Sequence, residues 1–475
     1  MEATWAIIIG SLIILGIGSA ISVYVGRKQS GSENWLVGGR SLPVYVVAGS
    51  QFATGMGGGV LVAHIGIGYS AGWSAITYNL LYSIGIILLV LLAGWLKKQK
   101  FSTLPDIFKK LYGNNKKMLT TVTLLAVVVP FGWLCTQLVA FANLFTEITG
   151  ISFTLLIIIF GIISLCFVLP GGLTSVAWTD FIFGCLMLAV SIVSAIYMLN
   201  MSGGWSNIVS NVPQEMIAFP EGMGAIGAST ILLWTFAIFP GALTNQMSYQ
   251  RIYAAKNIKV AKQGFIIAAI VGVVSGAWAS FMGIAILSQQ PGLANSELAA
   301  GWFLTQIPTW FLAIYASFII ATIMSTVSSA VQSVVVNISK DIYQSYVNPE
   351  VSERKLLYIS RLLSISVVII AVMLAIYYPR ALGWLQATYA YSAAGLLVPI
   401  FLGFLLRNKF SLTAKGALGG ILFGIIGAAS AQIMDTVVPY AVYGIGSSLI
   451  GFIVAHFLFR GGQEVGEEQK EVFAE

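Results

Sequence analysis

The sequence predicts an all-α polytopic membrane protein with about 13 transmembrane helices in a single domain. Apolar residues make up 58% of the 475 residues and charged residues only 9%, whereas a soluble globular domain carries about a quarter charged residues. The mean hydropathy is +0.90, and apolar runs of about 20 residues, long enough to cross a bilayer, recur along the chain. We therefore expect one transmembrane domain over 1–460 and a short acidic cytoplasmic tail over 461–475.

We interpret each apolar run as one span, in chain order. The first run follows Glu2 and precedes Arg27 and Lys28, which reverses the charge order of a signal peptide, so we expect a retained helix. The predicted spans are 4–26, 43–69, 73–96, 119–147, 151–169, 174–198, 225–249, 263–287, 306–338, 357–377, 383–406, 412–434 and 438–459.

Basic residues gather in alternate segments between these spans. With the amino terminus outside, 23 of the 24 Lys and Arg residues fall in inner segments and only Arg380 lies outside. The segment 251–262 is one of these inner segments. Because Lys and Arg favour the cytoplasmic side, we expect a multi-pass protein of the plasma (inner) membrane, with the amino terminus outside and the carboxyl terminus cytoplasmic. Topology and anionic lipids account for the net charge of +7, so no nucleic-acid partner is expected.

Two of the predicted spans contain helix-breaking stretches. Ala53-Thr54-Gly55-Met56-Gly57-Gly58-Gly59 interrupts the second span, since each glycine costs roughly 1 kcal/mol relative to alanine in a helix. The stretch 239–245, which contains Pro240, interrupts the seventh. Five spans separate the breaks, so the two copies would enter the membrane from opposite sides, as in transporters built from inverted repeats.

These breaks predict the internal organisation of the domain. We expect repeat one over 43–198 and repeat two over 225–406. The spans 4–26, 412–434 and 438–459 would then lie around the two repeats as peripheral helices.

Asp180 precedes an apolar stretch, 181–198, in the sixth predicted span. A carboxylate inside the membrane is costly and is a functional hypothesis by default. The alternative is that Asp180 lies only about two turns from the cytoplasmic end of the span and reaches water there.

A stripe of hydroxyl side chains marks the ninth predicted span. Thr322, Ser325, Thr326, Ser329 and Ser333 follow one another at spacings that place them on one helix face. Hydroxyls together with free carbonyls can supply the oxygens that a dehydrated sodium ion needs. The alternative is that these side chains bond their own backbone or pack against a neighbouring helix.

Other patterns exclude several classes of protein. The sequence contains no P-loop, HExxH or GxSxG motif and no paired carboxylates, so neither an ATPase nor an intramembrane hydrolase is expected and the protein is not predicted to be an enzyme. His64 and His456 are isolated in apolar surroundings, which favours packing over metal binding. The glycines of the first break have an alternative explanation too, since small residues let helices approach closely in lipid.

Several motifs, in order and spread over nearly the whole chain, make the sequence resemble the sodium:solute symporters. This family includes proline, sugar, pantothenate, sialate and choline carriers. The motifs are Gly39-Arg40-Ser41-Leu42-Pro43, Gly68-Tyr69, Thr103-Leu104-Pro105-Asp106, Gly171-Gly172-Leu173 through Trp178-Thr179-Asp180, Gln250-Arg251, Ser325-Thr326 and Asp341-Ile342-Tyr343.

The resemblance implies a fold similar to that of the leucine transporter, with two inverted five-helix repeats around a central site. It also implies a bound sodium ion. The implied ligands are the backbone carbonyls of Ala53, Met56 and Thr322 and the hydroxyls of Ser325 and Thr326, with Asp180 close to the ion.

The solute is less well defined by the resemblance, because Gly55 replaces an acidic residue of the proline carriers and a caging tryptophan of the choline carriers. A second caging tryptophan is replaced by Asn245. We expect the solute to contact Gly55, Gly57, Gly58, Tyr82, Trp133, Asn245 and Gln246.

Exposed amides and helix ends at the breaks favour a carboxylate, so we expect an amino acid such as proline, or a monocarboxylate. A quaternary amine, a sugar or another neutral solute, and proton coupling through Asp180, remain alternatives. A channel and a membrane sensor are the rivals from other classes.

Overall fold

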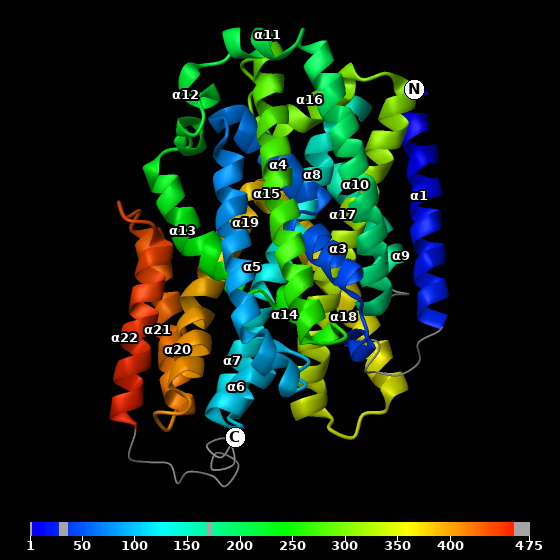
Figure 1. Ribbon diagram of the computed structural model, residues 1–475. Helices are drawn as coiled ribbons and strands as arrows, with labels where there is room; N and C mark the ends of the chain where they lie inside the picture. Colours follow the sequence, from blue (N-terminus) through cyan, green and yellow to red (C-terminus); the bar gives the residue numbers. More distant parts are fainter. Residues whose placement is uncertain (1, 28–36, 169–172, 460–475) are drawn as a thin grey trace.

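All secondary structure in the computed structural model is helical. The model describes residues 2–27, 37–168 and 173–459, in which the one β-type contact is an isolated bridge between Leu42 and Ala255. The predicted tail 461–475, Lys28 and the motif residues Gly171 and Gly172 lie outside the described residues. Long helices stand side by side across the molecule (Figure 1), which confirms the predicted all-α fold class.

Short helical segments alternate with long helices along the chain. The first half contains α1 (Glu2–Arg27), η1 (Gly38–Arg40), α3 (Val44–Gly55), α4 (Gly58–Ala71), α5 (Ser74–Lys98), α6 (Leu104–Tyr112), α7 (Lys116–Ala126), α8 (Val128–Thr149), α9 (Phe153–Val168), α10 (Leu173–Met201), α11 (Trp205–Ser210) and α12 (Gln214–Ile217). The second half contains η2 (Glu221–Gly224), α13 (Ala228–Leu243), α14 (Gln246–Ala254), α15 (Ile258–Gln289), η3 (Ser296–Leu298), α16 (Ala299–Gln306), α17 (Thr309–Val336), η4 (Asn337–Val347), α18 (Glu353–Tyr377), α19 (Ala381–Ser392), η5 (Ala393–Leu397), α20 (Val398–Leu406), α21 (Ala414–Ile433) and α22 (Tyr440–Leu458).

The described helices reproduce the predicted spans. Eleven are long and apolar enough to cross a membrane, and the bent pair α3–α4 adds a twelfth. The shorter apolar helix α9 coincides with the predicted span 151–169. The helix of the ninth span extends beyond the predicted span end at residue 338, because α17 continues through η4 to Val347.

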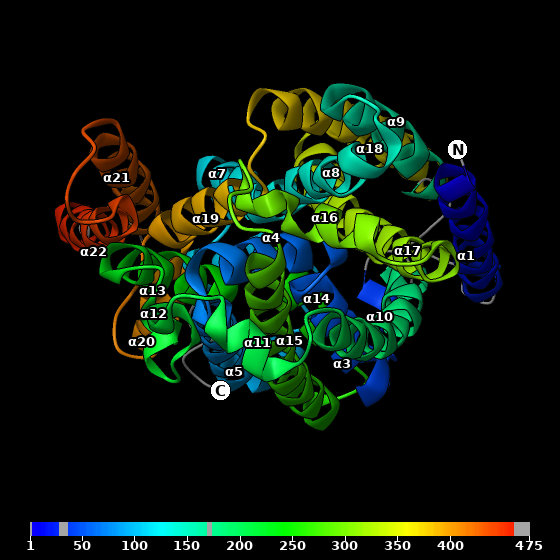
Figure 2. The same ribbon diagram turned by 90° about the horizontal axis from the view of Figure 1, so that it is seen from above.

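Burial separates the central helices from the peripheral ones. In the segment Lys116–Thr149, which holds α7 and α8, and in Thr309–Val347, 78% of the apolar window is buried, against 24% for α1 and 33% for α22. Seen from above, α1 lies at one edge of the bundle and the α21–α22 pair at the opposite edge (Figure 2). The centre of the bundle is therefore built around α8 and α17.

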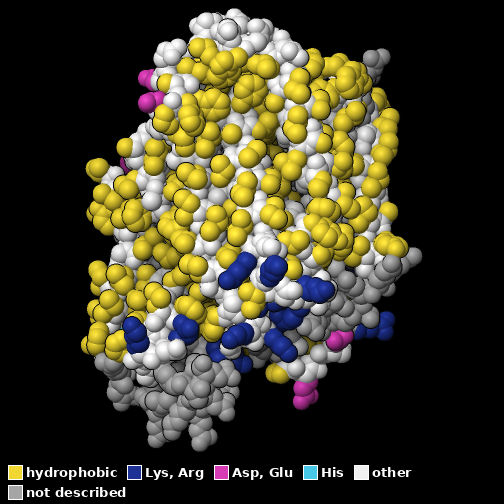
Figure 3. All heavy atoms as spheres, viewed as in Figure 1, with side chains coloured by type: hydrophobic (Ala, Val, Ile, Leu, Met, Phe, Trp, Pro, Cys, Tyr) yellow, Lys and Arg dark blue, Asp and Glu magenta, His cyan; other side chains and the backbone are white. Residues whose placement is uncertain are grey.

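The surface shows which part of the molecule faces lipid. Hydrophobic side chains cover the middle of the face in Figure 3, whereas Lys and Arg side chains gather at its lower end. Large apolar side chains such as Leu91 (75% exposed) and Ile192 (63% exposed) would be unfavourable in water but are stable against hydrocarbon. The chain begins α1 at the upper end and finishes α22 at the lower end (Figure 1).

The two helix breaks are shorter than predicted. Only Met56 and Gly57 separate α3 from α4, whose axes differ by 54°. Thr244 and Asn245 separate α13 from α14, and Pro240 lies inside α13. The predicted extents 53–59 and 239–245 are wrong because glycines are tolerated in terminal helical turns, where some backbone groups lack intrahelical partners anyway.

Candidate functional site

Asp180, in α10, is fully buried and surrounded by hydroxyl groups. Its Oδ2 accepts hydrogen bonds from Ser50 Oγ at 2.7 Å and from Ser329 Oγ at 3.2 Å. Its Oδ1 accepts a hydrogen bond from Ser325 Oγ. Helices α3, α10 and α17 therefore meet at this carboxylate, and the alternative prediction that it reaches water at the end of the span is wrong.

Arg251 is the site residue that sequence reasoning missed. The charge distribution places it in an inner segment, but its side chain is 1% exposed and its Nη2 lies 3.2 Å from Asp180 Oδ2. The same nitrogen donates to Thr54 Oγ1 at 2.7 Å and to Ser329 Oγ at 2.6 Å. The physical reason is that a buried carboxylate without a partner is far more costly than a buried pair whose hydrogen bonds are satisfied.

One signal in the sequence could have found this pair. The motif Gln250-Arg251 directly follows the second broken span, and an acid inside the membrane is usually paired with a base. A search for the partner of Asp180 would have reached Arg251.

Three of the five predicted sodium ligands lie together where α3 meets α17. Thr326 Oγ1 is 3.3 Å from the carbonyl oxygen of Ala53 and 3.0 Å from that of Thr322. Ser325 lies beside them but donates its hydroxyl to Asp180. Met56, the fifth, is buried at the break directly after α3. The arrangement brings oxygens of two helices to one point, as a site for a hard cation requires.

Part of the hydroxyl stripe also follows the alternative explanation. Thr322 Oγ1 donates to the carbonyl of Phe318, and Thr326 Oγ1 donates to that of Thr322, each one turn earlier in α17. These bonds to the helix backbone are common for Ser and Thr in apolar surroundings. The assignment of sodium to this stripe stays a prediction.

The glycines of the first break face different neighbours. A Cβ on Gly57 would lie 2.9 Å from Thr326 Cβ, and one on Gly58 would lie 2.8 Å from Ile323 Cγ1. Both distances are shorter than real contacts allow, so close packing on α17 is a sufficient reason for these two glycines. Gly55 instead faces Tyr82. The assignment of Gly55, Gly57 and Gly58 to the solute stays a prediction.

Aromatic and amide side chains lie on the other side of the break. Trp133 Nε1 donates to Tyr389 Oη at 3.1 Å, and the Tyr389 ring lies 6.4 Å from that of Tyr82. Gln51 Nε2 donates to Tyr82 Oη at 3.2 Å, while Gln137 Oε1 accepts the backbone N–H of Gly59 at 2.9 Å. The predicted pair Tyr82 and Trp133 is thus linked through Tyr389, which sequence reasoning did not single out.

The two residues predicted at the second break point in different directions. Asn245 Oδ1 accepts the N–H of Met247 at 3.0 Å and caps α14. Gln246 Oε1 accepts the N–H of Leu104 at 2.8 Å, so its side chain is directed at the short helix α6. Gln246 Oε1 therefore joins α14 to α6.

Contacts join α6 to η4 at the end of the bundle that is rich in Lys and Arg. Thr103 Oγ1 donates to Asp341 Oδ1 at 3.0 Å, and Lys340 Nζ lies 3.1 Å from Asp106 Oδ2. Although burial acts to raise the pKa of Asp106, Lys340 and the backbone N–H groups of Ser102 and Thr103 lower it overall. Asp106 is therefore ionised at neutral pH and holds Lys340.

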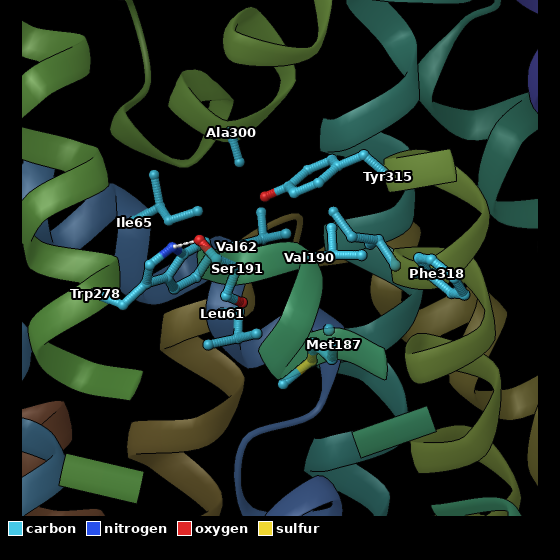
Figure 4. Close-up of a pocket in the computed structure, with 12 residues that line it drawn as sticks. Leu61, Val62, Ile65, Met187, Val190, Ser191, Trp278, Ala300, Tyr315 and Phe318 are labelled. Atoms are coloured by element: carbon cyan, nitrogen blue, oxygen red, sulfur yellow. Dashed lines mark hydrogen bonds between the residues drawn. The ribbon is translucent and has the colours of Figure 1, made fainter. Parts of the chain in front are cut away.

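An apolar pocket lies between α4, α10, α15 and α17, and it reaches Gly58 at the first break (Figure 4). Its lining is mostly apolar, and Trp278 Nε1 donates to the carbonyl of Ser191 at 2.7 Å. The lining residues are Gly58, Leu61, Val62, Ile65, Met187, Val190, Ser191, Trp278, Ala300, Tyr315, Phe318 and Ile319. Such a pocket does not suit a charged solute or an ion, whereas the two breaks offer free backbone groups and polar side chains for both.

Comparison with protein families matches residues 35–424 to the sodium:solute symporter family. The chain is 26% identical to a sodium/glucose cotransporter of Vibrio parahaemolyticus, over 90% of this chain and 84% of that protein. It is 25% identical to the sodium/proline symporter of Escherichia coli, over 90% of this chain and 86% of that protein. It is 27% identical to the high-affinity proline transporter PutP of Bacillus subtilis, over 85% of this chain and 87% of that protein.

Comparison with solved structures supports the predicted leucine-transporter-like fold. A sodium-coupled sialic acid symporter in a substrate-bound, outward-open state superimposes with a TM-score of 0.82 at 20% identity, covering 96% of this chain and 98% of that chain. Mhp1, a nucleobase-cation-symport-1 family transporter in a closed conformation, superimposes with a TM-score of 0.63 at 14% identity, covering 94% and 99%.

Proposed function

Because this chain belongs to the sodium:solute symporter family and is a sodium-coupled solute symporter of the membrane, we propose that it carries a small amino acid such as proline, or a monocarboxylate. One sodium ion binds between the first break and α17. Its ligands are the carbonyls of Ala53, Met56 and Thr322 and the hydroxyls of Ser325 and Thr326, with Asp180 beside it. The relatives named above are transporters, and we assign the chain to transport rather than catalysis.

One observation carries the sodium site. The Thr326 hydroxyl lies within 3.3 Å of the Ala53 carbonyl and 3.0 Å of the Thr322 carbonyl, so it joins oxygens of both helices. A cation at this point would be bound by the oxygen of the hydroxyl, with its proton turned aside, and by the same two carbonyl oxygens. The Ser325 bond to Asp180 then brings one full negative charge next to the ion.

Removal of the two hydroxyls tests the site without knowledge of the solute. Purified protein is melted in sodium chloride and in potassium chloride at equal ionic strength and fixed pH. Since a ligand at 100 times its dissociation constant stabilises by about 2.7 kcal/mol, wild type should melt at a higher temperature in sodium. The double substitution Ser325→Ala with Thr326→Ala should abolish that difference.

Ser328→Ala is the matched control, because Ser328 lies on the same helix and its hydroxyl bonds only the Met324 carbonyl among the described contacts. It should keep the sodium response. An undiminished response in the double variant would reject the site, and a response to pH in place of sodium would favour proton coupling through Asp180.

The solute side of the proposal rests on the first break. The helix α4 begins at Gly58, and its positive end therefore points at the centre of the bundle. Gln137 and Asn245 add amide groups there, and both are fully buried. This combination suits a small solute that carries a carboxylate. Gly55, Tyr82 and Trp133 form the remaining wall, and Gly57, Gly58 and Gln246 complete the proposed set.

The aromatic group favours a second candidate solute. Tyr82, Trp133 and Tyr389 are linked through ring contacts and one hydrogen bond, and aromatic faces attract quaternary amines. Thermal-shift screening with and without sodium separates the candidates, with L-proline, lactate, choline and glucose as probes. Sodium-dependent stabilisation by choline or glucose alone would replace the carboxylate proposal.

Transport would proceed by alternating access. In Figure 1, α4 and α13 lie above α3 and α14, so each break separates an upper from a lower half-helix. We place the end rich in Lys and Arg in the cytoplasm, with the amino terminus outside, in the plasma (inner) membrane. Sodium and solute stabilise each other's binding reciprocally. A membrane potential of 100 mV adds about 2.3 kcal/mol to the driving force for each positive charge that moves inward.

The rivals from other classes make different predictions. A channel would pass current that does not saturate with solute, whereas a carrier saturates. Single-channel recording in planar bilayers under a sodium gradient separates the two. A sensor would bind solute without moving it, so radiolabelled uptake into proteoliposomes under the same gradient distinguishes it from a carrier.

A further inference from the structure

Arg251 Nη2 lies among oxygen atoms of three helices, in surroundings that would suit a bound cation. It is 2.6 Å from Ser329 Oγ in α17, 2.7 Å from Thr54 Oγ1 in α3 and 3.2 Å from Asp180 Oδ2 in α10. Thr54 is the chain neighbour of Ala53, and Ser329 follows Thr326 by one helical turn. The guanidinium therefore contacts the residue next to one proposed sodium ligand on α3, and a residue one turn from another on α17.

Asp180 is shared between these two cation positions. Its Oδ2 faces Arg251, and its Oδ1 accepts the Ser325 hydroxyl, which belongs to the proposed sodium ligands. The carboxylate and the guanidinium are both buried, and like charges repel strongly where water is excluded. Sodium and Arg251 therefore compete for a single negative charge.

The position of Arg251 in the chain gives this competition a mechanical consequence. Arg251 belongs to α14, the half-helix after the second break, and its Nη1 donates to the Met247 carbonyl of the same helix at 3.1 Å. Its Nε donates to Ser50 Oγ in α3 at 3.2 Å. One side chain thus joins the two half-helices α3 and α14 to α10 and α17.

We propose that Arg251 is an internal cation that occupies Asp180 in the sodium-free carrier and is displaced from it when sodium binds. This inference rests on the sodium site proposed above. In the empty carrier Arg251 holds α3 and α14 against α10 and α17, so these helices can stay together after sodium has left. When sodium returns, it takes over part of the charge of Asp180.

Sodium titration of melting temperature tests the competition, with potassium replacing sodium at constant ionic strength. Arg251→Gln should lower the sodium concentration for half-maximal stabilisation by about tenfold or more, because a repelling charge is removed. Arg251→Lys keeps the charge and should stay within about threefold of wild type. An unchanged or raised concentration in Arg251→Gln overturns the proposal.

Two further comparisons protect the test against misfolding and general charge effects. If Arg251→Gln does not fold, Thr54→Val takes its place: it keeps both charges but removes the hydroxyl that accepts from Arg251 Nη2 at 2.7 Å, so Arg251 is displaced more easily and the half-stabilising concentration should fall; no change overturns the proposal. Lys340→Gln breaks a different ion pair, with Asp106, and should leave the sodium concentration unchanged. A tenfold fall of the half-stabilising sodium concentration in Lys340→Gln would overturn the proposal too.

The wild-type titration separates this inference from the proposed function. Wild type that does not respond to sodium rejects the sodium site itself. If wild type responds to sodium and Arg251→Gln has the same half-stabilising concentration, only the competition is rejected.

Discussion

The backbone N–H of Gly59 donates to Gln137 Oε1 at 2.9 Å, which joins the first turn of α4 to the middle of α8. Gln137 is fully buried, and its Nε2 has no hydrogen-bond partner in the part of the chain that the structure describes. A buried donor without an acceptor is costly, so an oxygen of the solute would satisfy it. The contact thus links the helix break to a side chain able to bind the solute.

Substitution of Gln137 tests this link. Gln137→Ala should raise the solute concentration for half-maximal uptake by about tenfold, since a lost hydrogen bond to a charged group is worth roughly 1.5 to 3 kcal/mol. Sodium-dependent stabilisation without solute should persist. Thr136→Val is the control, because Thr136 donates to the Gly132 and Ala381 carbonyls; an equal loss of affinity in it would contradict a specific role for Gln137.

Gly57→Ala tests the close contact of the break with α17. A Cβ at this position would lie 2.9 Å from Thr326 Cβ, so we expect a loss of about 1 to 3 kcal/mol from overpacking and a weakened sodium response. Gly94→Ala is the matched control, since a Cβ on Gly94 in α5 would meet no atom within 4 Å. Thermal melting in sodium and potassium compares the two variants, and equal melting temperatures would refute the contact.

Glu297 in η3 caps the beginning of α19 at the upper end of the bundle. Its Oε2 accepts the N–H of Ala381 at 3.1 Å and the side-chain amide of Asn143 at 3.1 Å, while Oε1 accepts the N–H of Leu382 at 3.0 Å. Burial raises the pKa of Glu297 above its ordinary value of 4.5, although these donors oppose the shift. The carboxyl group therefore takes up a proton more readily in the folded protein than in the unfolded chain.

The sign of the pH dependence follows from this shift. Because the folded-state pKa is raised, the stabilising contribution of protonation is complete below the unfolded pKa and is lost as the pH rises through the folded pKa. Wild type should therefore gain melting temperature relative to Glu297→Gln when the pH falls from 7 to the ordinary value of 4.5. A constant difference between the two proteins over this range would contradict the raised pKa.

Cysteine labelling tests the proposed orientation. Glu215 in α12 and Lys109 in α6 are both exposed. They lie in segments between spans, and we assign the segment of Glu215 to the outside and that of Lys109 to the cytoplasm. In a variant without its three native cysteines, Glu215→Cys should react with an impermeant maleimide in intact cells, whereas Lys109→Cys should react only after permeabilisation. The reverse pattern would invert the topology.

The site divides into parts that sequence reasoning reached and parts that it did not. The spacing of Thr322, Ser325 and Thr326 predicted a common helix face, and the structure brings Thr326 next to Ala53. The direction of Gln246 Oε1, in contrast, was not predicted: it accepts a hydrogen bond from the backbone N–H of Leu104. A helix period tells which residues share a face, but the rotation of that face towards a partner depends on packing between distant segments.

The sequence by itself determined the helical spans, the two breaks and the membrane setting, because run length, glycine content and the distribution of charge are local properties of the chain. Only the tertiary structure decided that Arg251 is buried against Asp180 and that Gly57 packs on Thr326. These residues are far apart in the chain, and their contacts exist only because both broken helices and α17 converge near one buried carboxylate. The high cost of leaving that charge unpaired selects this arrangement.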